Sequence, residues 1–449
     1  MRILMLGWEF PPHISGGLGT ACYGLTKGLD EIGVEVCFVL PSAVPPTASS
    51  HVAFRSPTNL LAAGQSWEEE HTKLFQRVDL RRVSAALQPY ASPATHEQAV
   101  RDLIAKQVKV RREAGVLQEL AAVSAAAAVP SGSFVRGPGA NYQGDLMGQV
   151  HRYARMTVEL SKVEAFDVVH AHDWMTYPAG LAVAAVTGKP LVVHVHSTEF
   201  DRSGDNVNQQ VYDIERAGMQ GASRVVCVSN LTRNIAVSRY GVPVEKVEVV
   251  YNAVELPSGG EWALKPIRRT EKIVLFLGRV TIQKGPEYFL MAARKVVEKF
   301  KNVRFVIAGS GDMITQCIRL AADLKLGGYV TFTGFLRGRD VDRVFEMADL
   351  YVMPSVSEPF GIAPLEALSH NVPAIISKQS GVSEVLTHVL KVDFWDTDEM
   401  ANKILAVLRH PPLQKTLGQH GHIELQKLSW RDSATKLKSI YDELLTGRN

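Results

Sequence analysis

Short apolar runs alternate with longer stretches that carry apolar residues at helical spacing through most of the chain. A short, continuous apolar run is typical of a strand buried on both faces, and such strands joined by helices form parallel sheets. In the first half of the chain the predicted strands cover residues 2–6, 35–40, 167–169, 191–195 and 224–228. In the second half they cover residues 272–277, 303–308, 330–332, 350–353 and 374–377. The pattern therefore predicts an α/β protein.

A segment rich in glycine and proline, residues 255–266, separates the two sets of strands. Its composition is typical of a linker. The 449 residues also exceed the roughly 100–200 residues of an ordinary domain. We therefore expect residues 1–255 and 256–428 to form two doubly wound, Rossmann-like domains that face a central cleft, where ligands bind beyond the carboxyl ends of the strands.

Residues 43–141 interrupt the alternation, because they open and close with prolines and glycines and hold helical patterns between. We interpret them as an insertion in the first domain. Within it, residues 101–112 carry five basic side chains near a few apolar ones. A solvated helix is favoured, since no Trp or Phe anchors the apolar side, although peripheral membrane contact remains open.

The composition excludes some classes of binding partner and indicates the cell compartment. The formal net charge is only +3, and the basic residues are scattered along the chain, so nucleic acid is not the expected partner. The four cysteines are far apart and lie mostly within apolar runs, which is typical of reduced core residues. The first apolar run is too short for a signal peptide, and no later run reaches the length of a membrane span. We expect a cytoplasmic protein.

The first candidate for chemistry is the loop of residues 9–20, which follows a strand and leads into a helical pattern. Gly16, Gly17 and Gly19 let the backbone approach a ligand closely, and a helix N-terminus offers N–H groups to an anion. The spacing differs from a dinucleotide fingerprint, and the lysine of a P-loop is missing. A tight structural turn explains this loop equally well.

The second candidate is the turn after the strand at residues 272–277, which carries Arg279 and Lys284. A departing diphosphate gains negative charge in the transition state, and two fixed cations in a dry cleft stabilise that change. Two solvated loop cations are the alternative.

The third candidate is the loop and helix start at residues 353–368, with Glu358 on the loop and Glu366 eight residues later. The amides around Phe360, Gly361 and Ile362 suit donor-sugar or phosphate oxygens. A carboxylate accepts the paired hydroxyls of a ribose well, which suits Glu366. The alternative for Glu366 is a helix-dipole role in the first turn.

Two possible metal motifs are set aside, and we expect no metal. Asp396 and Asp398 match an Asp-x-Asp pattern but precede a helical pattern, so a helix cap explains them better. His170, His172, His194 and His196 form two His-x-His pairs at strand ends, and histidines beside a ligand cleft explain them better than a metal site.

Taken together, the three candidate segments resemble the retaining glycosyltransferases of the glycogen synthase and sucrose synthase superfamily, which are similar to glycosyltransferase family 4 and have the two-domain GT-B fold. The resemblance rests on Ser15-Gly16-Gly17, on Arg279 with Lys284, and on the Glu358-x7-Glu366 loop, in this order along both halves of the chain. Further similar segments are residues 169–175, 195–199, 228–230, 250–252 and 308–312. Residues 429–449 resemble the terminal helix that crosses back to the N-terminal domain in this fold.

The resemblance implies a role for each site residue. Arg279 and Lys284 would neutralise the leaving diphosphate, Glu366 would bind the donor ribose, and Glu358 and His196 would contact the donor sugar. Asp173 and Gly16 or Gly17 would face the acceptor or a phosphate. The implied reaction moves a hexosyl group from a nucleotide-diphosphate sugar to a hydroxyl acceptor with retention, without a cofactor and without a carboxylate nucleophile.

One difference from the family pattern leaves the identity of the sugar donor undetermined. Bacterial ADP-glucose glycogen synthases carry a lysine two positions before the paired glycines, whereas this chain has Ile14. Two hypotheses therefore stay open: a glucan synthase, and a hexosyltransferase that acts on a lipid or a small molecule. A sugar-nucleotide epimerase and a non-catalytic nucleotide-sugar-binding protein are the rival classes.

Overall fold

The computed structural model describes residues 1–10, 17–42, 53–55, 78–84, 146–255 and 271–447. Gly16, the basic segment 101–112 and most of the expected insertion 43–141 lie outside the described residues.

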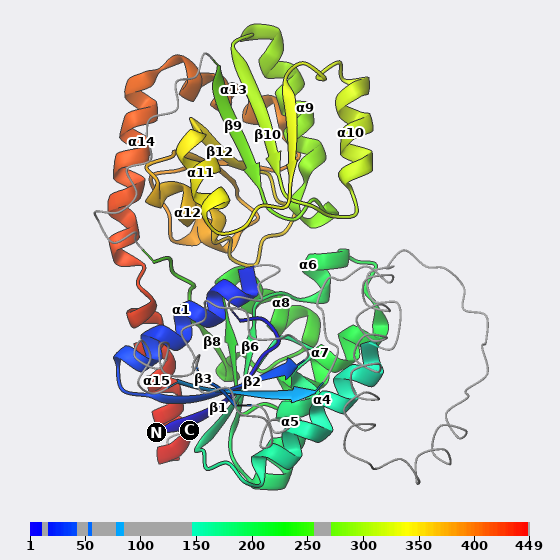
Figure 1. Ribbon diagram of the computed structural model, residues 1–449, viewed down its shortest axis with the longest axis vertical. Coiled ribbons are helices and arrows are strands. Elements are labelled where there is room, and N and C mark those ends of the chain that lie inside the picture. Colours follow the sequence, from blue (N-terminus) through cyan, green and yellow to red (C-terminus); the bar gives the residue numbers. More distant parts are fainter. Residues whose placement is uncertain (11–16, 43–52, 56–77, 85–145, 256–270, 448–449) are drawn as a thin grey trace, which may run out of the picture.

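A parallel sheet forms the core of the N-terminal half (Figure 1). Its eight described strands run in the order β3-β4-β2-β1-β5-β6-β7-β8. The strands are β1 (Arg2–Leu6), β2 (Glu35–Ser42), β3 (Ala53–Arg55), β4 (Val78–Ser84), β5 (Val168–His172), β6 (Leu191–Val195), β7 (Arg224–Cys227) and β8 (Val247–Val249). The helices are α1 (Gly17–Glu31), α4 (Leu146–Ser161), α5 (Tyr177–Thr187), α6 (Glu199–Ser203), α7 (Gln209–Gly221), α8 (Asn230–Tyr240) and the 3-10 turn η3 (Val244–Lys246).

A second parallel sheet has six described strands in the order β11-β10-β9-β12-β13-β14. Numbered within this half, the order is 3-2-1-4-5-6, the order of a Rossmann domain. The strands are β9 (Lys272–Leu277), β10 (Val303–Ala308), β11 (Val330–Gly334), β12 (Leu350–Met353), β13 (Ala374–Ser377) and β14 (Leu390–Val392). The helices are η4 (Ile282–Lys284), α9 (Pro286–Lys299), α10 (Ile314–Asp323), α11 (Arg339–Met347), α12 (Ala363–Ser369), η5 (Gly381–Glu384), α13 (Thr397–Arg409), α14 (Pro411–Glu424), η6 (Leu425–Lys427) and α15 (Trp430–Thr446).

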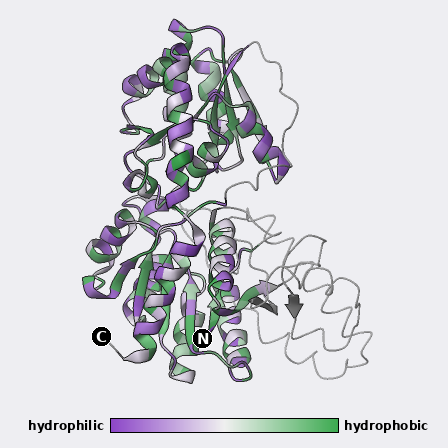
Figure 2. Cartoon of the chain, turned by 90° about the vertical axis from the view of Figure 1, so that its left-hand side faces the viewer, coloured by the Kyte–Doolittle hydropathy of each residue, from purple (hydrophilic) through white to green (hydrophobic). Residues whose placement is uncertain are grey.

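The predicted α/β class and the predicted strands are confirmed, because each apolar run forms a strand at or within about three residues of its expected bounds, and all of these strands except β11 are mostly buried. Figure 2 shows hydrophobic residues concentrated along the strands and helices with one polar side. Within the expected helical insertion 43–141, the described residues form two strands, β3 and β4, which extend the N-terminal sheet through β2. Asp and Arg residues interrupt the apolar pattern of β4, so the sequence lacks the continuous run of a central strand.

The last helix, α15, packs on α1 of the N-terminal half, although α14 before it belongs to the other half (Figure 1). Trp430 and Tyr441 are buried in the N-terminal core. Gly24 and Gly28 of α1 lie directly against Trp430, and a Cβ atom at Gly28 would overlap the Trp430 backbone carbonyl. Only glycine permits this close approach.

Both halves also touch through the start of α8. Ser229 Oγ donates to the Pro359 carbonyl at 2.5 Å. The Glu384 carboxylate accepts from the backbone amides of Asn230 and Leu231 at 2.9 and 2.8 Å. A carboxylate at the positive end of a helix is stabilising, so this contact fixes the two halves on one side. Among the described helices, none is long and apolar enough to cross a membrane.

The close approach of α1 and α15 gives a stability prediction. Gly28→Ala should lower the free energy of unfolding by about 1–3 kcal/mol, because the backbone of Trp430 has to move. Gly327→Ala is the matched control, since a Cβ atom there has no neighbour within 4 Å. The midpoint of thermal unfolding measures both, and equal midpoints for the two variants would contradict the packing described.

Candidate active site

A cleft of about 580 Å³ lies between the two sheets, at the carboxyl edge of each. Its size suits a ligand of several hundred daltons. The N-terminal half contributes Gly17, Leu18, Thr20, Asp173, His196, Ser197 and Asn252. The other half contributes, among others, Gly278, Arg279, Lys284, Ser310, Arg337, Glu358, Phe360, Gly361, Ile362 and Glu366. The described residues of the predicted site are therefore brought together at one cleft.

Arg279 and Lys284 lie on the turn after β9, where the strand order of the C-terminal sheet reverses. Ligands of open α/β sheets bind at such a switch point. The Arg279 guanidinium donates to Gln283 Oε1 at 3.5 Å, and the Gln283 carbonyl accepts from the amide of Val356 at 2.9 Å. The turn after β9 is thus attached to the loop after β12.

Lys284 and Glu358 form an ion pair across these two loops. Lys284 Nζ lies 2.5 Å from Glu358 Oε2, and the two side chains are 21% and 8% exposed. Ser355 Oγ donates to the same carboxylate oxygen at 3.0 Å. The buried carboxylate therefore fixes the position of the ammonium group in the lining of the cleft, and it also offsets part of the ammonium charge.

Gly361 adopts a backbone conformation that favours glycine in the loop that carries Glu358. Its φ is +101°, and a Cβ atom there would lie 3.1 Å from Glu358 Cγ and 3.2 Å from Met353 Sδ. The Phe360 side chain is buried in the core beside this turn, and its carbonyl accepts from the Val382 amide at 2.7 Å. The backbone of this loop is thus fixed close to the cleft.

Glu366 lies in the first turn of α12 and also lines the cleft. Both interpretations of this residue thus fit its position. Burial raises the pKa of its carboxyl to about 7, and the negative charge of Asp342 adds to the shift. The carboxyl is therefore poised to gain or lose its proton near neutral pH.

Asp173 follows β5 with φ +57°, a left-handed conformation that Asp tolerates better than most residues. Its Oδ1 accepts from the backbone amides of His196 and Ser197 at 2.7 and 3.3 Å. Burial raises the pKa of Asp173 to about 7, against the opposing hydrogen bond from the His196 amide. Asp173 lines the cleft as expected, but its contacts make it a positioning residue for the turn that carries His196.

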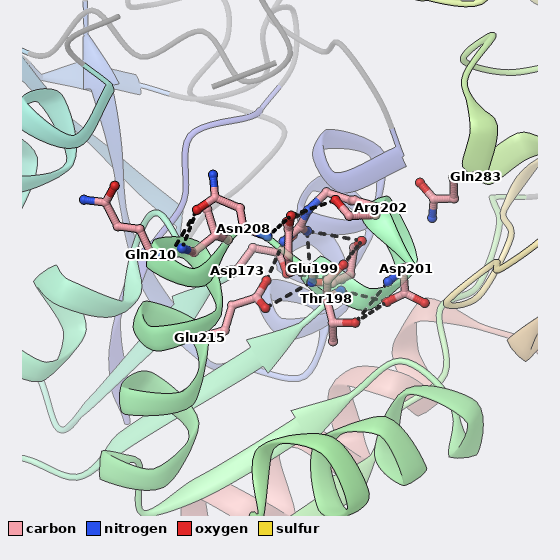
Figure 3. A network of polar contacts seen from close by, with 12 residues as sticks. Asp173, Thr198, Glu199, Asp201, Arg202, Asn208, Gln210, Glu215 and Gln283 are labelled. Atoms are coloured by element: carbon pink, nitrogen blue, oxygen red, sulfur yellow. Dashed lines mark hydrogen bonds and ion pairs between the residues drawn. The ribbon is translucent and has the colours of Figure 1, made fainter. Parts of the chain in front are cut away.

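A buried polar network supports that turn from behind (Figure 3). Arg202 forms ion pairs with Glu199 at 3.1 Å and Glu215 at 2.5 Å, and Tyr240 donates a short hydrogen bond to Glu215. Arg202 also donates to the Ser197 carbonyl at 3.4 Å. The members of this network come from three helices, and no local spacing connects them, so the sequence alone does not reveal it.

The four histidines do not share one environment. His196 lines the cleft, whereas His170, His172 and His194 are 0%, 0% and 1% exposed. These three do not line the cleft but lie behind His196, because β5 and β6 direct their side chains into the layer beneath the helices, where His170 contacts Tyr441 of α15 and His172 lies close to Cys22 of α1. Burial lowers the pKa of His196 to about 3, so its ring is neutral at pH 7.

The structure also describes part of the glycine-rich loop and the Asp-x-Asp pattern. Gly17 begins α1 at the cleft, and the Gly19 amide donates to the buried Glu9 carboxylate at 3.2 Å. Asp396 caps α13 by accepting from the Glu399 amide at 2.9 Å, so the interpretation of the Asp-x-Asp pattern as a helix cap is confirmed.

Thr20, Ser310 and Arg337 also line the cleft, and none of them was an individual candidate, although Thr20 and Ser310 lie in the segments 9–20 and 308–312 singled out above. Ser310 follows the end of β10, the strand next to β9, so the shared edge of the sheet was a usable signal. Arg337 adds a third cation from the loop after β11, and its sequence carries no comparable signal.

Comparisons with known proteins agree with this geometry. The family "Glycosyltransferase Family 4" matches residues 118–257, and the family "Glycosyl transferases group 1" matches residues 263–423. An uncharacterized glycosyltransferase of Methanocaldococcus jannaschii is 26% identical over 98% of both chains. A glycogen synthase of Mycobacterium tuberculosis is 24% identical over 98% of this chain and 94% of that one.

Solved structures share the fold. Sucrose-phosphate synthase from Thermosynechococcus elongatus superposes with a TM-score of 0.70 at 18% identity, over the full length of both chains. Anabaena HepE in complex with UDP and glucose superposes with a TM-score of 0.65 at 16% identity, over 99% of this chain and 100% of that one. By its two matched domains and its paired parallel sheets, the chain belongs to the GT-B glycosyltransferases, with a family 4 domain followed by a group 1 domain.

Proposed function

We propose that this glycosyltransferase moves a hexosyl group, with glucosyl as the first candidate, from a nucleotide-diphosphate sugar to a glucan with retention of configuration. The donor binds in the cleft, and the reaction needs neither a cofactor nor a metal ion. The four cysteines are buried and form no disulfide with one another, which fits a reducing compartment such as the cytoplasm.

The observation that carries the proposal is the position of Arg279 and Lys284 at the switch point after β9, with Lys284 held by Glu358. A nucleoside diphosphate bound there would place its leaving oxygen against two cations. Charge that develops as the sugar departs is stabilised most by groups that need no reorganisation, and the Glu358 carboxylate already fixes Lys284.

Retention requires that the acceptor attack the face of the anomeric carbon from which the diphosphate departs. The bond between the anomeric carbon and the diphosphate breaks, and the acceptor oxygen bonds to the same face of that carbon. The acceptor proton passes to the departing phosphate, so no protein base is required at the acceptor. The cleft carboxylates Asp173 and Glu358 fit this scheme, because backbone amides and Lys284 already engage them.

A glucan is the first acceptor class because the glycogen synthase of M. tuberculosis aligns over 98% of this chain. Relatives with small-molecule acceptors, such as the D-inositol 3-phosphate glycosyltransferase of Pseudarthrobacter chlorophenolicus, align over 62% of the chain. A lipid or small-molecule acceptor is the second candidate. A non-catalytic nucleotide-sugar-binding protein is disfavoured by the cationic pair and by His196 at the cleft.

A transfer assay tests the proposal. The full chain, incubated with UDP-glucose or ADP-glucose and glycogen, should form new α-linked residues, which proton NMR identifies by their anomeric signals. Excess EDTA should change the rate by less than about twofold, because the cations Arg279 and Lys284 take the place of a metal. A β-linked product, epimerised donor without transfer, or a complete loss of activity that added metal reverses would contradict the proposal.

Lys284→Ala should lower kcat by at least about 100-fold while the protein stays folded, because the leaving diphosphate loses a fixed cation. Lys415→Ala, an exposed lysine on α14, is the matched control and should leave kcat unchanged. Steady-state kinetics and circular dichroism provide the two readouts. Equal kcat values for the two variants would remove Lys284 from the mechanism.

Glu366 makes nucleotide binding depend on pH. Only the ionised carboxylate accepts both ribose hydroxyls, and its pKa in the free protein is about 7. Affinity for UDP and ADP should therefore rise by about tenfold from pH 6 to pH 8 and then level off. Titration calorimetry of the wild type and of Glu366→Gln separates this effect from titration of the nucleotide phosphate, which both proteins share. Parallel pH profiles for the two proteins would show that Glu366 does not bind the ribose.

A further inference from the structure

Four imidazole rings form a ladder on one face of the N-terminal sheet. His170 and His172 are two residues apart on β5, so they share a face, and the register of the sheet pairs His172 with His194 on β6. His196 follows at the end of β6. The ring centroids lie 4.5 Å apart for His170 and His172, 5.2 Å for His172 and His194, and 4.2 Å for His194 and His196.

Five nitrogens of this ladder are buried and have no hydrogen-bond partner among the described residues. They are His170 Nε2, His172 Nε2, His194 Nδ1, His194 Nε2 and His196 Nδ1. Buried polar atoms normally have partners, because an unsatisfied one loses its hydration without compensation. A concentration of five such atoms in one layer therefore needs an explanation that packing alone does not supply.

Two hydrogen bonds orient the rings. His170 Nδ1 lies 2.5 Å from the hydroxyl of Tyr441 on α15, and His172 Nδ1 lies 2.9 Å from His196 Nε2. Each bond uses one ring nitrogen and leaves Nε2 of His170 and of His172 available. This is how metal-ligating histidines are held, with the second nitrogen bonded to a neighbouring group that fixes the ring.

We propose that His170, His172 and His194 form a binding site for a divalent transition-metal ion, with Zn²⁺ as the first candidate. One ligand nitrogen from each lies within 4.8 Å of the others. Three histidines are a known ligand set for Zn²⁺, and imidazole also suits Cu²⁺ and Ni²⁺. Ligands of a tetrahedral ion with bonds of about 2.0 Å lie about 3.3 Å apart, so the rings turn inward when the ion enters.

Cys22 and His196 extend the site towards the cleft. Ligand atoms of Cys22, His172 and His196 form a second group within 4.8 Å, and His196 lines the cleft, which provides a path of entry. Bound at the inner group, the ion links β5, β6 and, through Tyr441, α15. It stabilises the N-terminal domain and does not take part in sugar transfer, because none of its three ligands is among the described residues that line the cleft.

Metal binding can be measured without any transfer assay, so its failure is distinct from failure of the proposed function. The full chain, stripped with a chelator and dialysed, is titrated with CoCl₂ and then with ZnCl₂. We expect about one Co²⁺ per chain with visible absorption typical of four-coordinate cobalt, loss of that absorption when Zn²⁺ is added, and a higher thermal unfolding midpoint with Zn²⁺.

Two variants locate the site. His194→Phe keeps a ring in the ladder but removes a ligand, so it should bind Co²⁺ at least about tenfold more weakly. The double variant His388→Ala/His420→Ala removes an exposed pair of stacked histidines whose ring centroids are 5.1 Å apart. It should bind Co²⁺ as tightly as the wild type does. Wild-type protein that takes up no Co²⁺ and no Zn²⁺ would overturn the proposal, whether or not the variants fold. Undiminished binding by His194→Phe, or loss only in the His388/His420 variant, would overturn it equally.

Discussion

Every described strand of both sheets runs parallel to its neighbours, and this constraint determines where ligands can bind. In a parallel sheet all loops that follow the strands emerge at the same edge, so residues far apart in the chain meet there. The turn after β9 and the loop after β12 are 74 residues apart at Lys284 and Glu358, yet they are joined by a 2.5 Å ion pair. Because the carboxyl edges of both sheets line one cleft, residues from each half, such as His196 and Arg279, contribute to the same site.

The cleft is held from both halves by polar contacts that are mostly buried. Ser357 Oγ donates to Asp201 Oδ1 at 2.6 Å, and Asp201 is itself bonded to the amide of Thr198 at the start of α6. The loop that carries Glu358 is thus connected to the turn that carries His196. These contacts explain how a site divided between two sheets keeps its cations and carboxylates in a fixed arrangement, which catalysis by charge stabilisation requires.

Much of the fold could be predicted from the sequence, because buried parallel strands leave continuous apolar runs such as residues 303–308. Strand β4, which lies between β3 and β2, was missed because charged residues interrupt its apolar pattern. Arg279, Lys284, Glu358 and Glu366 were found because they follow strand ends, and they line the cleft. The pairing of Lys284 with Glu358, the positioning role of Asp173 and the burial of three histidines depend on contacts between distant segments, which no local pattern records.

A crystal structure of the protein with UDP, and a second with ADP, would test the central claim most directly. We expect the diphosphate to lie within hydrogen-bonding distance of the Arg279 guanidinium and Lys284 Nζ, with the ribose hydroxyls on Glu366 and the outer phosphate directed towards His196. A nucleotide bound elsewhere in the molecule, or a diphosphate in the cleft that contacts neither Arg279 nor Lys284, would contradict it.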